Sequence, residues 1–139
     1  MEKMVITQVV IDTDILIDLL RNVKITVNFL SEIERKGVLL STTIINAFEL
    51  FHGAYKSKKR EENLLAIRKL IDRLIIVRMG LKSAETAGRI YADLEAKGQP
   101  IGLRDAILGA ITLSKGYALA TRNVEHLKKI PGLTLIPAP

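Results

Sequence analysis

The sequence predicts an α/β protein in which helices cover both faces of a parallel β-sheet of about five strands. Its apolar runs are continuous rather than alternating, which is typical of strands buried on both faces. Segments with helical periodicity separate these runs, so strands and helices alternate along the chain. The 139 residues contain no internal repeat or flexible linker, and we therefore expect a single domain spanning residues 1–139.

The first half of the chain contains two strands and four helices. Residues 5–11 are an apolar run that ends at Asp12, and the short apolar helix predicted at 14–21 follows at once. A helix at 26–36 stops before Gly37, a residue typical of helix C-termini. After the short strand at 38–40, helices at 43–58 and 61–70 form a pair divided by the basic run KSKKR, residues 56–60.

The second half continues the alternation. Residues 74–77 (LIIV) predict a third strand, and the helix at 83–97 begins with a serine and ends before Gly98. The helix at 104–115 again stops at a glycine, Gly116. The run YALA at 117–120 predicts a fourth strand, and LTLI at 133–136 predicts a weaker fifth one.

Composition excludes several classes of function. The chain has no cysteine, which rules out disulfides, thiol catalysis and cysteine-based metal sites. No window reaches the ~20 apolar residues of a membrane span, and the N-terminus lacks a leader layout, so we expect a cytoplasmic protein without membrane association. The net charge of +6 favours a polyanion such as RNA, although a basic surplus also serves solubility.

Polar residues follow the predicted strands at the edge where open α/β sheets bind ligands. Asp12, Thr13 and Asp14 follow the first strand, and Thr121 and Asn123 follow the fourth. Two further carboxylates lie in otherwise apolar helical segments: Glu49 in TTIINAFELFHGA and Asp105 in QPIGLRDAILGAI. If Asp12, Glu49 and Asp105 converge, their repulsion requires a cation, and oxygen ligands favour Mg²⁺ or Mn²⁺.

Each of these residues also has a structural interpretation. Asp12, Thr13 and Asp14 are suitable helix caps, Asp105 suits a helix N-terminus, and Asn123 is a common turn residue. Glu49 is the hardest to explain as a purely structural residue, because its neighbours are predicted core. Three further polar residues are expected on the surface: Asp18, His52 and His126. Of these, Asp18 and His52 lie close enough in sequence to the candidate residues to support the site.

Basic residues adjoin the proposed site. Arg104 and Arg122 each neighbour a candidate site residue and are the better candidates for contact with an RNA phosphate. The basic run contributes Lys56, Lys58, Lys59 and Arg60, which form either a solvated loop or a guide for an RNA backbone. No aromatic stacking platform is visible, so base specificity cannot be predicted.

In this order the segments resemble the PIN-domain ribonucleases, especially the VapC-type toxins of toxin–antitoxin pairs. The matching stretches are VVIDTDILIDLLR, STTIINAFELFHGA and PIGLRDAILGAITLSKGYALATRN, followed by VEHLKKIPGLTLIPAP. By position, the resemblance implies that the family's acidic residues fall on Asp12, Glu49 and Asp105, with Thr121 as the accompanying hydroxyl. The fourth position, often Asp in the family, falls on Asn123, which removes one negative charge and leaves the number of metal ions, one or two, open.

The resemblance also implies an architecture and partners. We expect a three-layer α/β/α sandwich with strand order 3-2-1-4-5, a homodimer, and a small antitoxin whose C-terminal tail covers the active site. The expected reaction is metal-dependent hydrolysis of RNA that leaves a 3′-hydroxyl and a 5′-phosphate, because an activated water attacks rather than the ribose hydroxyl.

Two alternatives remain open from the sequence alone. An apolar strand followed by Asp-x-Asp also begins the haloacid-dehalogenase-like phosphohydrolases, in which Asp12 would be a nucleophile, but Glu49 would then have no role. The chain could otherwise be a non-catalytic module that binds RNA or a partner protein, with the acidic residues acting only as caps.

Overall fold

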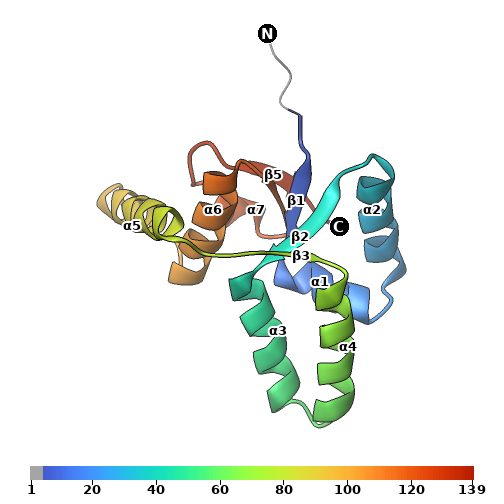
Figure 1. Cartoon of the computed structure of the whole chain (residues 1–139). Helices are drawn as coiled ribbons and strands as arrows, with labels where there is room; N and C mark the ends of the chain where they lie inside the picture. The colour runs from blue at the N-terminus through green and yellow to red at the C-terminus, as the bar shows by residue number, and fades with distance from the viewer. Residues whose placement is uncertain (1–4) are drawn as a thin grey trace.

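A five-stranded parallel sheet forms the centre of the computed structural model (Figure 1). The model describes residues 5–139; residues 1–4, part of the N-terminal stretch considered above for a leader, lie outside the described residues. The strands are β1 (Gln8–Ile11), β2 (Leu39–Thr43), β3 (Ile75–Val77), β4 (Ala118–Thr121) and β5 (Thr134–Pro137). Their order is β3-β2-β1-β4-β5, which confirms the predicted order.

Every neighbouring pair of strands is parallel, with β1 in the middle of the sheet. Successive residues of β1 face opposite sides: Val9 and Ile11 contribute to one hydrophobic core, and Val10 contributes to the other. All three are fully buried, which explains why residues 9–11 are apolar without interruption instead of alternating with polar residues.

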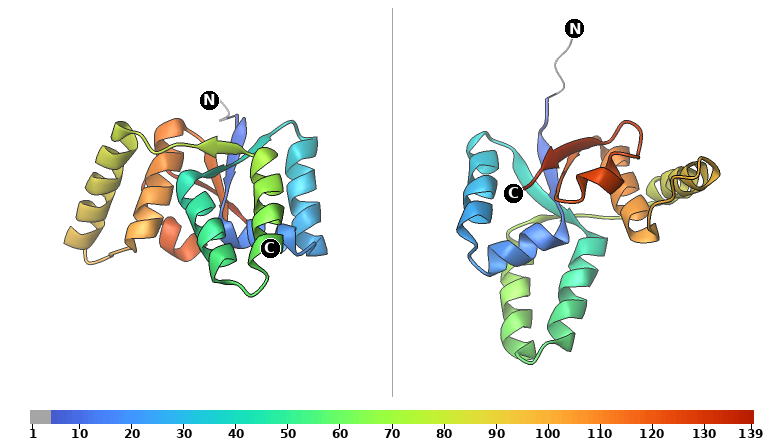
Figure 2. Two further views of the ribbon diagram at one scale, coloured as in Figure 1. Left: turned by 60° about the horizontal axis from the view of Figure 1, so that its bottom comes forward. Right: turned by 180° about the vertical axis from the view of Figure 1, so that it is seen from behind.

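Seven helices connect the strands within the described chain: α1 (Thr13–Leu20), α2 (Lys24–Arg35), α3 (Ile44–Lys56), α4 (Arg60–Asp72), α5 (Leu81–Ala96), α6 (Leu103–Lys115) and α7 (Val124–Leu127). Helices α1 to α4 supply the core on one face, and α5 to α7 supply the core on the other. The two views of Figure 2 show this separation of the helices, and the three-layer sandwich is confirmed.

The six predicted helices agree with the observed ones to within two residues at each end. Helix α7 was not predicted, because four residues are too short to show helical periodicity. Strand β1 begins at Gln8 instead of residue 5, and Val5 is 79% exposed.

Strand β2 is longer than predicted, and this moves three polar residues into the sheet. Ser41, Thr42 and Thr43 belong to the strand and are fully buried, whereas the sequence suggested that they follow it. The hydroxyl of Ser41 donates to the carbonyl oxygen of Val9 at 2.8 Å, and that of Thr42 donates to the carbonyl oxygen of Ile11 at 2.7 Å. Satisfied hydroxyls of this kind are tolerated in a buried strand.

Within residues 5–139, no helix combines the length and apolar character required to cross a lipid bilayer.

Candidate active site

The candidate site lies where the chain leaves the carboxyl ends of the two central strands. Asp12 directly follows β1, and Thr121 is the last residue of β4. Helix α3, which carries Glu49, follows β2, and α6 carries Asp105 in its first turn. Figure 1 shows α1 and α3 beginning on the same side of the sheet, below its strands. Parallel strands therefore bring four distant segments to one edge, as the sequence predicted.

Asp12 is the most firmly held of the site carboxylates. It is only 7% exposed, and it caps α1 by accepting a hydrogen bond from the backbone N–H of Thr13 at 2.8 Å. Its second oxygen, Oδ2, accepts from the hydroxyl of Thr121 at 2.8 Å. The expected capping role of Asp12 is confirmed, and the same side chain faces the other candidate residues of the site.

Asn46 is a site residue that the sequence analysis missed. It is fully buried on α3, and its Nδ2 donates to Oδ1 of Asp12 at 3.3 Å and to the hydroxyl of Thr13 at 2.8 Å. Its Oδ1 accepts from the backbone N–H and the hydroxyl of Thr43, at 3.1 and 2.7 Å. These contacts form a capping box at the start of α3. The spacing Thr43-x-x-Asn46 is the signal that could have revealed it.

Glu49 reaches the site from the middle of α3. Its Oε1 accepts a hydrogen bond from the hydroxyl of Thr13 at 2.6 Å. Its side chain is 32% exposed, compared with 10% for Asp12 and 11% for Asp105. Glu49 is therefore the carboxylate of the three that solvent reaches most easily.

Asp105 and Asn123 form the opposite wall. Asp105 is 8% exposed, and its Oδ2 accepts from Nδ2 of Asn123 at 3.1 Å. The backbone N–H of Asn123 donates to the hydroxyl of Thr121 at 3.0 Å. His126 is exposed, as expected, yet its Nδ1 lies 3.9 Å from Oδ2 of Asp105. This places His126 at the edge of the site, a position that its sequence context did not suggest.

Arg104 lies between the three carboxylates and contacts all of them. Its Nη2 donates to Asp12 at 2.6 Å and to Glu49 at 2.8 Å, and its Nη1 donates to Asp105 at 2.9 Å. Burial alone would lower the pKa of this guanidinium, but hydrogen bonds to Glu49, Asp12 and Asp105 and the charge of Asp12 outweigh burial and raise the pKa. The residue expected to meet a phosphate thus contacts the site's own acids in this structure.

Arg122 and Asp18 form a separate pair beside the site. The guanidinium of Arg122 binds the carboxylate of Asp18, and its Nε donates to the carbonyl oxygen of Pro139 at 2.7 Å. Asp18 is therefore half-buried and paired, which corrects the expectation that it faces solvent. The prediction that Asp18 faces solvent failed because its partner, Arg122, lies on a distant segment of the chain.

A pocket of about 440 Å³ opens over these residues. Its lining includes most of the predicted site: Asp12, Thr13, Asp14, Glu49, Arg104, Arg122 and Asn123. Asp14 is exposed at this pocket. Lys56, Lys58, Lys59 and His52 are not part of the lining; the lysines lie at the tip of the α3–α4 pair, and the ring of His52 stacks on Phe48 with the centroids 5.9 Å apart.

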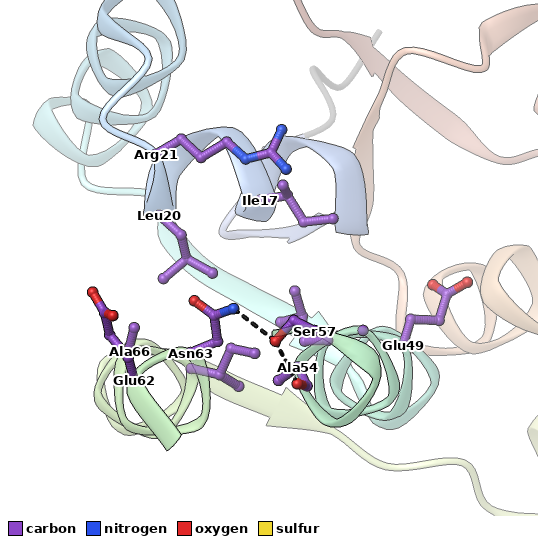
Figure 3. A pocket seen from close by; sticks show the side chains of 12 residues that line it. Ile17, Leu20, Arg21, Glu49, Ala54, Ser57, Glu62, Asn63 and Ala66 are labelled. Atoms are coloured by element: carbon purple, nitrogen blue, oxygen red, sulfur yellow. Dashed lines mark hydrogen bonds between the residues drawn. The ribbon is translucent and has the colours of Figure 1, made fainter. Parts of the chain in front are cut away.

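A second pocket of about 400 Å³ lies between α1, α3 and α4 (Figure 3). We call it the helical groove; Ile17, Leu20, Leu50, Ala54, Ala66 and Ile67 give it an apolar wall, and Arg21, Glu49 and Glu62 add charge. Within it, Nδ2 of Asn63 donates to the hydroxyl of Ser57 at 2.9 Å (Figure 3). Glu49 lines both pockets, so the groove adjoins the candidate site at this residue.

The donor chemistry of the site suits a hard divalent cation. Asp12, Glu49 and Asp105 offer only oxygen atoms, the ligand type that Mg²⁺ and Mn²⁺ prefer. With Arg104 between them, however, no three His, Asp or Glu side chains of residues 5–139 are arranged to hold a metal ion together. The residue types suit a divalent cation, but in this structure the guanidinium of Arg104 binds carboxylate oxygen atoms that would otherwise be available to the cation.

The chain matches a known protein family and relatives of known name. Residues 9–133 match the PIN domain family. The chain is 33% identical to the tRNA(fMet)-specific endonuclease VapC of Salmonella typhimurium over 91 residues, which cover 66% of this chain and 69% of that relative. It is 31% identical to ribonuclease VapC2 of Rickettsia felis over 108 residues, covering 78% of this chain and 80% of the relative.

Solved structures show the same fold. VapBC2 from Rickettsia felis, bound to a DNA fragment from its promoter, matches with a TM-score of 0.85 and 27% identity over 93% of this chain and 97% of that chain. DNA-bound VapBC from Salmonella typhimurium matches with a TM-score of 0.81 and 26% identity over 95% of this chain and 98% of that chain. The sequence match and the strand order agree, and the chain belongs to the PIN domain family as a VapC-type member.

Proposed function

We propose that this chain is a single-domain, metal-dependent endoribonuclease that hydrolyses RNA phosphodiester bonds and is the toxin of a toxin–antitoxin pair. The observation that carries the proposal is the convergence of Asp12, Glu49 and Asp105, from three separate segments, on the guanidinium of Arg104 beside a solvent-facing pocket that Asp12 and Glu49 line. The relatives named above as ribonucleases and the net charge of +6 support an RNA substrate.

The roles follow from burial and hydrogen bonding. Asp12 and Asp105 are buried and oriented by Thr121 and Asn123, so they are the residues that would hold Mg²⁺ or Mn²⁺. Such an ion supplies an activated water and offsets charge on the phosphate. Glu49, more exposed and oriented by the hydroxyl of Thr13, binds or deprotonates the attacking water.

Three further polar residues support this arrangement. Asp14 borders the pocket, where its charge attracts a cation. Arg122 lines the same pocket and is placed to contact an RNA phosphate. Asn123 supplies an amide instead of a carboxylate, which lowers the negative charge available to a second metal ion and favours a site with one ion.

The test is cleavage of total RNA by the purified protein in Mn²⁺ or in EDTA, with the product ends mapped. We expect cleavage only with Mn²⁺, leaving 3′-hydroxyl and 5′-phosphate ends. Glu49→Gln should lower the cleavage rate by about 100-fold or more while folding and RNA affinity persist. The matched control is Glu34→Gln, the same change at an exposed position on α2, which should cleave like the wild type.

The same experiment separates the alternatives. A phosphorylated Asp12 would indicate the haloacid-dehalogenase-like reaction, which the PIN family match and the position of Glu49 beside Asp12 both disfavour. RNA binding without cleavage would indicate a non-catalytic module. Products with 2′,3′-cyclic ends would contradict hydrolysis by an activated water, since they require attack by the ribose hydroxyl.

The antitoxin belongs in the helical groove. The solved VapBC structures are toxin–antitoxin complexes, and this groove combines an apolar wall with a direct path to Glu49. An amphipathic segment that fills it would place its end at the catalytic pocket and block access for RNA.

A second copy of the chain is the expected partner for the exposed face of α3. Ile44, Phe48 and Tyr55 repeat at helical spacing on this helix and are 46%, 65% and 49% exposed. Apolar side chains that share one exposed helix face are typical of protein interfaces. This stripe supports the homodimer.

A further inference from the structure

Arg104 is bound by the carboxylates of the site, although a residue that only binds a phosphate would not need these contacts. All three of its guanidinium nitrogens donate to carboxylates: Nε to Glu49 at 3.1 Å, Nη1 to Asp105 at 2.9 Å and Nη2 to Asp12 at 2.6 Å. A fully engaged guanidinium is a strongly bound cation, because charged hydrogen bonds are stronger than neutral ones. Arg104 is therefore part of how this acidic cluster is balanced.

The oxygen atoms that Arg104 contacts are the ones that a metal ion would require. Oδ2 of Asp12 and Oδ2 of Asp105 already accept hydrogen bonds from Thr121 and Asn123, residues at and just after the end of β4. Oδ1 of Asp12 and Oδ1 of Asp105 are both bound by the guanidinium, and Oδ1 of Asp12 also accepts from the N–H of Thr13 and from Nδ2 of Asn46. A cation that both carboxylates bind through Oδ1 must compete with Arg104 for these atoms.

Burial indicates which of the partners can move. The side chains of Asp12 and Asp105 are 10% and 11% exposed, whereas the side chain of Arg104 is 33% exposed and lies on the wall of an open pocket. Asp12 is additionally held by the N–H of Thr13 and by Asn46. The carboxylates form a fixed frame, and the long arginine side chain can turn out of it into solvent.

Charge favours the exchange. Three carboxylates meet one guanidinium in this arrangement, which leaves the cluster with an excess of two negative charges when His126 is neutral. A divalent cation offsets more of this charge than a guanidinium does. Arg104 thus offsets part of the negative charge of the buried carboxylates in the folded chain. The remaining negative charge allows them to bind a more highly charged ion.

We propose that Arg104 is a built-in counter-ion that competes with the divalent cation, so that metal binding requires the guanidinium to leave Asp12 and Asp105. The released side chain stays on the pocket wall near Arg122, where it can meet the phosphate of the RNA. Arg104 is accordingly a positioning residue whose partner changes when the site is loaded. This inference rests on the proposed function in taking Asp12 and Asp105 as the carboxylates that hold the ion.

The first experiment measures Mn²⁺ binding directly, by calorimetry and by the loss of the spectrum of free Mn²⁺, without any RNA. Arg104→Met should bind Mn²⁺ about tenfold more tightly than the wild type, a difference of about 1.4 kcal/mol. Arg104→Lys, which keeps the charge but cannot bridge three carboxylates, should fall between them. The matched control is Arg122→Met, which removes a pocket arginine that pairs with Asp18 instead of the three acids, and its affinity should change by no more than about twofold.

A second experiment follows the guanidinium itself in the wild-type protein, so it does not depend on the folding of a variant. The Nε–H resonance of Arg104, assigned through its side-chain carbons to its own backbone amide, should shift or broaden when diamagnetic Mg²⁺ is added, while that of Arg122 should change less. Unchanged or weaker Mn²⁺ binding by Arg104→Met, or an unchanged Nε–H resonance at saturating Mg²⁺, would overturn the inference. If neither protein binds Mn²⁺, both the inference and the metal-dependent function fail; tighter binding by Arg104→Met without RNA cleavage by the wild type would refute only the nuclease.

Discussion

Replacing Asn46 by Asp tests whether this buried amide holds the acidic site together. The change is nearly isosteric, but it substitutes an acceptor for the Nδ2 group that donates to Asp12 at 3.3 Å and to Thr13 at 2.8 Å. A charged Asp at this position would face a carboxylate oxygen at the same 3.3 Å, with a repulsion of about 5 kcal/mol at an effective dielectric constant of about 20.

Protonation limits this cost. Holding the new carboxyl neutral at about pH 7 costs about 4 kcal/mol, given an ordinary Asp pKa of about 3.9 and about 1.4 kcal/mol per unit. We therefore expect Asn46→Asp to lower the free energy of unfolding by about 4 kcal/mol near pH 7. Because the pKa of the new carboxyl is raised in the folded protein, the loss should shrink as the pH falls, to about 1.5 kcal/mol near pH 5.

Urea unfolding followed by circular dichroism, in EDTA, measures both values. Each variant is compared with the wild type at the same pH. Asn28→Asp provides the matched control, because Asn28 is exposed on α2 and the same change there should cost less than about 0.5 kcal/mol. Equal stability of the two variants near pH 7, or a loss that does not depend on pH, would refute the role assigned to Asn46.

Three further results are expected. Thr121→Val should lower the free energy of unfolding in urea by about 2–3 kcal/mol, because Thr121 is fully buried and bonds both Asp12 and the N–H of Asn123; a loss below about 0.5 kcal/mol would contradict this. Phe48→Glu should convert the dimer to a monomer in light scattering while its circular dichroism remains that of the folded chain, and a monomeric wild type would refute the proposed interface. Ala66→Arg, at an exposed position of the helical groove, should abolish co-purification with a co-expressed antitoxin while RNA cleavage persists, and retained co-purification would move the antitoxin away from this groove.

The fold was largely predictable because its signals are local. A continuous apolar run indicates a strand that is covered on both faces. Apolar residues that repeat at helical spacing indicate a helix that packs one side against the core. The errors occur where local composition misleads. Residues 41–43 (Ser-Thr-Thr) have the composition of a loop, yet the strand continues through them. The hydroxyls of Ser41 and Thr42 donate to carbonyl oxygens of β1, and the hydroxyl of Thr43 caps α3.

The sequence predicted which acidic residues lie together in the candidate site, but not which side chains they contact. Parallel strands bring residues such as Asp12 and Asn123 to one edge of the sheet, where both line the same pocket, so their proximity follows from strand order alone. Asn46 escaped notice because an amide inside a helix has many ordinary explanations. Its importance depends on Asp12 and Thr13, which lie 34 and 33 residues away in sequence.

The sequence by itself determined the order of strands and helices, the edge of the sheet at which polar residues collect, and the identity of the three carboxylates. These properties depend on burial patterns and on connections that neighbouring residues encode. Only the tertiary structure decided that Arg104 contacts all three carboxylates and that Arg122 pairs with Asp18. A long, flexible cationic side chain binds whichever anion lies within its reach, and that distance is defined only once the chain has folded.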